Sequence, residues 1–128
     1  GKMKHTAIRG TRGAEVIDEL PVLESDIVLP KRRFSAFFKT DLDMTLRTLR
    51  IDTIAVTGLT TEVCVLSTVL DGLANDFNSV LISDCCASRS RETHDAVVAA
   101  FSRFPTYPTL RVRTAEEFLA EAGGEAVL

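Results

Sequence analysis

Short apolar runs, several of them rich in β-branched residues, recur along the chain and predict buried strands. They occupy residues 26–30, 53–57, 80–83 and 110–112. Continuous apolar runs bounded by turn residues are typical of the strands in a parallel sheet, which helices cover on both faces.

The segments between and after these runs carry the three-to-four-residue spacing of amphipathic helices. We expect helices over residues 40–49, 61–75, 93–104 and 115–122. Thr40 or Asp41 is suited to cap the first of these and Thr114 the last, while Gly123 marks the end of the last.

Strand and helix alternate through the whole second half, which predicts an α/β fold with a mainly parallel sheet in a Rossmann-like α/β/α sandwich. The 128 residues suit one domain, and neither a repeat nor a linker divides residues 1–128. Residues 1–25 are less regular, and within them we expect a loop over 9–13 and a short helix over 14–20.

Composition narrows the class of protein. Hydrophobic residues make up 45% of the chain and the net charge is −3, so we expect neither nucleic acid nor a membrane as a partner. Three cysteines, two of them adjacent, do not make a disulfide framework. They favour reduced thiols and a cytoplasmic location.

Cys64 occupies the position with the strongest chemical signal. It falls in the first turn of the expected helix 61–75, directly after the strand 53–57, where helix N–H groups favour a thiolate and a nearby oxyanion. The alternatives are a nucleophile and a small buried filler. For Cys85 and Cys86, packing is the simpler interpretation.

A nucleophilic thiol needs a cationic partner or a base. Lys31 follows the expected strand 26–30 and would then lie at the same sheet edge as Cys64, although a solvated basic run is the alternative. His94 is either a base or a surface histidine.

Four motifs together resemble the isochorismatase-like cysteine hydrolases, which include nicotinamidases and N-carbamoylsarcosine amidases. In chain order they cover residues 9–16, 31–37, 58–65 and 84–94, with sequences RGTRGAEV, KRRFSAF, GLTTEVCV and DCCASRSRETH. The similarity spans nearly the whole chain in the correct order, so its combination of motifs is far more specific than any one of them.

The resemblance implies catalytic roles. Cys64 would attack the carbonyl of a small amide or carbamoyl compound, and ammonia would leave a covalent acyl-enzyme. Lys31 would keep the thiol ionised. The N–H groups of Thr60 and Cys64 would bind the oxyanion, with a cis peptide at Leu59–Thr60.

The resemblance also implies a substrate pocket. Its candidate wall residues are Leu59, Phe34 and Phe37, with core packing an equal alternative for Phe37. It calls for no organic cofactor, and family members are often homo-oligomers, so we expect a dimer or larger assembly.

The sequence departs from the family at its start. The family's general base is an aspartate at the end of a first strand, and the first strand–helix–strand portion has no counterpart here. Asp18 and Asp26 match positions that are not the base. A longer protein, a second chain or a shortened inactive relative would each explain this. His5 is one residue out of register for a metal ligand, so we predict no metal.

Three functions follow from these observations. The first is a cysteine-dependent amidohydrolase. The second is a non-catalytic, oligomeric binding or scaffold protein that keeps the fold without the base. The third is a redox-active thiol protein that uses Cys64 with Cys85 or Cys86.

Overall fold

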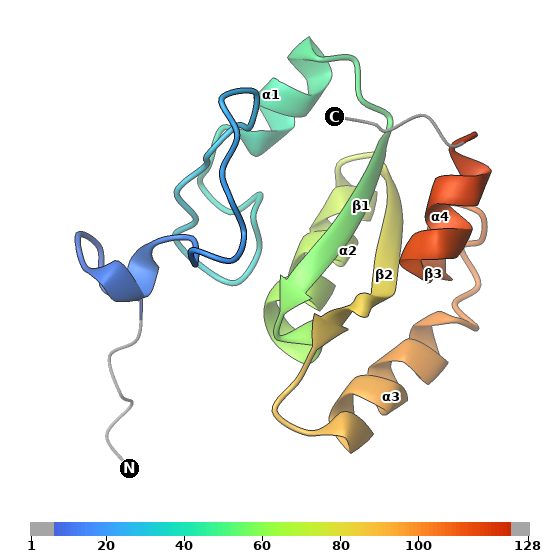
Figure 1. The fold of residues 1–128 in the computed structure, drawn as a ribbon. Coiled ribbons are helices and arrows are strands. Elements are labelled where there is room, and N and C mark those ends of the chain that lie inside the picture. The colour runs from blue at the N-terminus through green and yellow to red at the C-terminus, as the bar shows by residue number, and fades with distance from the viewer. Residues whose placement is uncertain (1–6, 124–128) are drawn as a thin grey trace.

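The computed structural model describes residues 7–123. Its elements follow in chain order from a short 3₁₀ turn to a C-terminal helix (Figure 1). They are η1 (Arg12–Ala14), α1 (Leu42–Thr48), β1 (Thr53–Leu59), η2 (Thr61–Val65), α2 (Leu66–Ala74), β2 (Asn78–Ala87), α3 (Arg91–Phe101), β3 (Leu110–Arg113) and α4 (Ala115–Glu121).

The strands form one parallel sheet with the order β1-β2-β3. Thr53 pairs with Asn78 and Ser79 pairs with Leu110, so the strands begin nearly level and their carboxyl ends share one edge. The register shifts between Val56 and Gly58, near the end of β1. This sheet confirms the predicted α/β class, and β1 and β2 extend further than the apolar runs predicted.

The hydrophobic core lies where α2 packs on the central strand. Val69 on α2 and Leu81 on β2 are fully buried, and Val65 and Leu110 are nearly so. Gly72 lets α2 approach the sheet, because a Cβ there would lie 2.5 Å from Ser79 Oγ. These contacts fix η2 and α2, and therefore Cys64, against the sheet.

The helix ends follow the predicted capping chemistry in part. Thr114 caps α4 through a capping box with Glu117, as its sequence predicts. Ser90 caps α3 by accepting a hydrogen bond from the Thr93 N–H. At the start of α1, Thr40 Oγ1 accepts from the Leu42 N–H at 3.3 Å.

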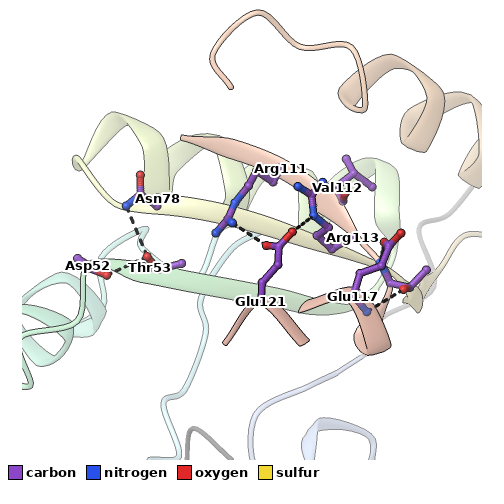
Figure 2. Close-up of polar contacts among 9 residues, drawn as sticks. Asp52, Thr53, Asn78, Arg111, Val112, Arg113, Glu117 and Glu121 are labelled. Carbon is purple, nitrogen blue, oxygen red and sulfur yellow. Dashed lines mark hydrogen bonds and ion pairs between the residues drawn. The ribbon is translucent and has the colours of Figure 1, made fainter. Parts of the chain in front are cut away.

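An ion-pair cluster docks α4 on the edge strand β3 (Figure 2). Glu121 accepts from Arg111 Nη1 at 2.7 Å and from Arg113 Nε at 2.5 Å. These contacts lower the pKa of Glu121 and raise that of Arg113. The cluster joins the last two elements of the described chain.

Two predictions for the first part of the chain are wrong. Residues 26–30 form no strand, and Ile27 and Val28 are 61% and 65% exposed. No strand within residues 7–123 lies beside this run to pair with it, so its apolar pattern has neither a ladder nor a core to join. The expected helix over 14–20 does not form, because the single turn η1 ends at Ala14 and residues 15–20 are not helical. His5 lies outside the described residues, as does Gly124, which the sequence offers beside Gly123 as the end of the last helix.

The helices of the described chain are short. Within residues 7–123, none has the length and apolar content needed to cross a membrane.

Candidate active site

Cys64 lies in η2, a π-helical turn that follows β1 and continues directly into α2. The two ends of this turn, Thr61 and Val65, are buried, whereas the Cys64 side chain keeps partial access to solvent. π-Helical turns are rare and often occur at functional sites. The sequence predicted a helix here but not its wider first turn.

Lys31 reaches Cys64 across the chain. Its Nζ lies 3.8 Å from Cys64 Sγ, and it also donates hydrogen bonds to the carbonyl oxygens of Arg33 at 2.5 Å and Phe34 at 3.2 Å. An ammonium group in this place favours the thiolate form of the cysteine. The pairing agrees with the prediction, although the strand 26–30 that suggested it does not form.

One side chain anchors the segment 31–37, hereafter the Lys31 loop, to the helical segment that carries Cys64. Thr68 Oγ1 accepts from the Ala36 N–H at 3.1 Å and donates to the Cys64 carbonyl at 2.8 Å. Thr68 is 9% exposed and neighbouring Ser35 6%, so these hydrogen bonds are shielded from water. The loop therefore has a fixed attachment one helical turn after Cys64.

The connection from β1 to η2 has an unusual backbone. The Leu59–Thr60 peptide is cis, at the bond where the resemblance implies one, and Gly58 before it has a φ of +122°. A φ in this range suits glycine. The Thr60 carbonyl then accepts from the N–H groups of Val63 and Val65, which closes the turn. That the Thr60 and Cys64 N–H groups bind an oxyanion remains a prediction.

Two side-chain contacts join this turn to the chain after β2, one to the β2–α3 connection and one to α3. Ser88 Oγ donates to Glu62 Oε2 at 2.5 Å, and Thr61 Oγ1 lies 2.9 Å from His94 Nδ1. The Ser88 hydrogen bond is the main cause that holds the pKa of Glu62 below its ordinary value. Nothing in the sequence singled out Glu62 or Ser88, and His94 was expected to be either a base or a surface histidine.

The predicted pocket residues divide into two groups. Phe37 stacks on Phe77, with ring centroids 5.8 Å apart, which favours its alternative role in core packing. Phe34 and Leu59 are 61% and 70% exposed, so either can meet a ligand. A separate cavity of about 530 Å³ lies between the end of β2 and α3, and neither Cys64 nor Lys31 lines it.

The other two cysteines lie within β2 rather than after a strand. Cys86 Sγ is 3.8 Å from the Val56 carbonyl, and burial raises the pKa of this thiol. A thiol that resists ionisation is a poor nucleophile. All three cysteines are free, and Cys64 alone among them has a lysine contact.

The described residues, 7–123, provide no carboxylate that forms an ion pair with Lys31 beside Cys64. Asp18 pairs with Arg12 at 2.9 Å, and Asp26 accepts from the Leu23 N–H at 2.8 Å. Likewise, no group of three or more metal-ligating side chains is found in this part of the chain.

Comparison with known proteins places this arrangement in a family. A protein-family model described as "Isochorismatase domain" matches residues 1–117. The chain belongs to the isochorismatase family of hydrolases. The order of motifs around Lys31 and Cys64 had already indicated this membership.

Three proteins that are similar to this chain in sequence carry different names. The chain is 37% identical over 109 residues to the uncharacterized isochorismatase family protein YwoC of Bacillus subtilis, a match that covers 84% of this chain and 55% of that protein. It is 46% identical over 70 residues to the ureidoacrylate amidohydrolase RutB of Cronobacter sakazakii, covering 55% and 30%. An Arabidopsis thaliana protein named "probable inactive nicotinamidase" is 40% identical over 91 residues, covering 70% and 46%.

Solved structures agree with the fold. An isochorismatase-like hydrolase from Alkaliphilus metalliredigens superposes with a TM-score of 0.84 at 36% identity, covering 92% of this chain and 62% of that one. The N-carbamoylsarcosine amidase from Thermoplasma acidophilum gives a TM-score of 0.76 at 33% identity, covering 88% and 62%. This chain thus spans less than two thirds of the length of these relatives.

Proposed function

We propose that the whole protein is a cysteine-dependent amidohydrolase that cleaves the C–N bond of a small amide or carbamoyl compound and releases ammonia. The observation that carries the proposal is the 3.8 Å contact between Lys31 Nζ and Cys64 Sγ at the carboxyl end of β1. In open parallel sheets this edge is where ligands bind. The amidohydrolases among the relatives support the same class of reaction.

The proposed reaction runs in two steps. The Cys64 thiolate adds to the carbonyl carbon, and the N–H groups of Thr60 and Cys64 stabilise the oxyanion that forms. The C–N bond breaks and ammonia leaves with a proton from a general acid, so that the acyl group stays on sulfur. Water then attacks the thioester and gives a proton back to the general acid–base residue, which releases the product acid and the Cys64 thiolate.

The general acid–base residue would come from outside residues 7–123. The described sheet pairs β1 on one side, with β2, so a further strand can add beside β1. We propose that a carboxylate on such a strand, from the whole protein or from another chain, completes the site next to Lys31.

Ammonia release tests this function. The whole protein is assayed against a panel of small amides and carbamoyl compounds, with Cys64→Ala as the test variant and Cys86→Ala as the matched control. We expect turnover that Cys64→Ala abolishes and Cys86→Ala retains. Ammonia release that survives Cys64→Ala would overturn the proposal.

A second candidate is a non-catalytic relative. It is favoured by the absence, within residues 7–123, of a carboxylate paired with Lys31, and one relative is itself named as inactive. No ammonia release from any amide, together with a Cys64 that iodoacetamide still alkylates, would favour this candidate.

A further inference from the structure

Glu62 and Ser88 make a side-chain contact that the proposed mechanism does not use. The Ser88 hydroxyl donates to Glu62 Oε2 at 2.5 Å, and 26 residues separate the two. Ser88 directly follows β2, and Glu62 lies in η2 after β1. The contact therefore spans the carboxyl ends of two neighbouring strands.

The contact between Glu62 and Ser88 bears on the proposed oxyanion donors because of where Glu62 lies. Glu62 lies midway between Thr60 and Cys64, whose N–H groups are the proposed oxyanion donors. Thr68, in the first turn of α2, holds the Cys64 carbonyl at 2.8 Å. Ser88, in the β2–α3 connection, is the partner of Glu62.

The next residue back makes a parallel contact. Thr61 Oγ1 lies 2.9 Å from His94 Nδ1, and Thr61 is fully buried. Consecutive residues of η2 are thus fastened to the β2–α3 segment, one to its connection and one to its helix. A short turn held at both residues has little freedom to rotate its peptide groups.

We propose that Glu62 and Ser88 are positioning residues that hold the Thr60–Cys64 backbone in the geometry that binds an oxyanion. This inference rests on the proposed function. Oxyanion donors stabilise the developing charge only when they are fixed in advance, and small displacements of catalytic groups cost large factors in rate.

A role for Glu62 as the missing general base fits the structure less well. The hydrogen bond from Ser88, followed by one from the backbone N–H of Glu62, keeps the pKa of this carboxyl below its ordinary value. A carboxylate stabilised in its ionised form is a weak proton acceptor. Its contacts suit a hydrogen-bond acceptor that fixes the backbone.

Two electrophiles separate positioning from thiolate formation. Iodoacetamide alkylates the Cys64 thiolate by displacing iodide and forms no oxyanion. With benzaldehyde, the Cys64 sulfur adds to the carbonyl carbon. The carbonyl oxygen then takes up negative charge and, after that, a proton. The rate at which iodoacetamide alkylates Cys64 is measured at increasing concentrations of benzaldehyde. The rate without benzaldehyde reports the thiolate, and the decrease in rate gives the dissociation constant of benzaldehyde.

We expect Glu62→Ala and Ser88→Ala to weaken benzaldehyde binding about tenfold, below the full loss of an oxyanion donor. The alkylation rate without aldehyde should stay within about twofold, because the Lys31 contact remains. Glu62→Gln keeps an acceptor oxygen for Ser88 and should restore most of the affinity. The double variant should equal either single one.

Ser90→Ala is the matched control, because it removes a hydroxyl from the cap of α3, two residues from Ser88. It should lower the melting temperature and leave the benzaldehyde constant unchanged. Unchanged binding in Glu62→Ala and Ser88→Ala, or equal losses toward both electrophiles, would overturn the positioning role alone. A wild-type Cys64 that benzaldehyde does not protect would contradict the proposed function itself, and the positioning role with it.

Discussion

The ammonium nitrogen of Lys31 lies 3.8 Å from the sulfur of Cys64, although 33 residues separate them in the chain. Two backbone carbonyls of the Lys31 loop also accept hydrogen bonds from this ammonium. The lysine is therefore fixed by its own loop and directed at the thiol. This contact, the Thr68 hydrogen bonds that anchor the loop, and the Glu121 ion pairs on α4 each predict a measurable effect.

Replacing Lys31 should slow the chemistry of Cys64. In Lys31→Met the thiolate loses its neighbouring positive charge, and we expect alkylation by iodoacetamide at neutral pH to slow about tenfold. The measurement is the rate of modification of the peptide that contains Cys64. Lys39→Met removes a lysine whose ammonium lies over the Phe38 ring, and should leave the rate unchanged. Equal rates in wild type and Lys31→Met would contradict the pairing.

Thr68→Val should cost stability and loosen the Lys31 loop. The substitution keeps the shape of the side chain but removes the bonds to the Ala36 N–H and the Cys64 carbonyl. A buried N–H left unpaired costs about 1–3 kcal/mol, which urea unfolding measures. Thr48→Val removes a hydroxyl bonded to the Met44 carbonyl on an exposed helix, and should change the free energy of unfolding far less. Similar losses in both variants would argue against the anchor.

The Glu121 cluster predicts a pH dependence of stability. Arg113 lowers the folded-state pKa of Glu121 below its ordinary value of 4.5. The contacts therefore stabilise the fold above pH 4.5, and this stabilisation is lost as the pH falls through the lower folded-state value. The melting temperature of wild type should decline below pH 4.5 more steeply than that of Glu121→Gln. Parallel curves for the two proteins would contradict this role for the ion pairs.

Local signals in the sequence predicted much of the fold. The apolar runs around Val56, Leu81 and Leu110 predicted strands that the sheet contains. In β2 the run is continuous because both faces are buried, as Val80, Leu81 and Ile82 show. Thr114 predicted the start of α4 because its hydroxyl pairs with a backbone group three residues ahead. Both signals depend on near neighbours.

The run at residues 26–30 shows where a local signal fails. Its apolar pattern suits a strand, yet a strand forms only when another is beside it, and the described chain provides none. The Lys31–Cys64 contact survives this error because it depends on Thr68 and on the carbonyls of the loop. The wrongly predicted strand suggested the pair, and the order of the motifs around Lys31 and Cys64 supported it independently.

The contact between Glu62 and Ser88 had no signal in the sequence. Both residues lie within motifs, but polar side chains at strand ends follow no periodic pattern. Only the shared edge of β1 and β2 brings them together across 26 residues. Such pairs depend on register, which the apolar runs do not determine residue by residue.

Trapping the acyl group tests the central claim most directly. The whole protein is mixed with an amide that it hydrolyses, quenched in acid within the first turnover and digested, and the peptides are weighed by mass spectrometry. We predict a mass increase equal to the acyl group on the peptide that contains Cys64. Ammonia release with the acyl mass on Cys85 or Cys86, or with none on any cysteine, would contradict it.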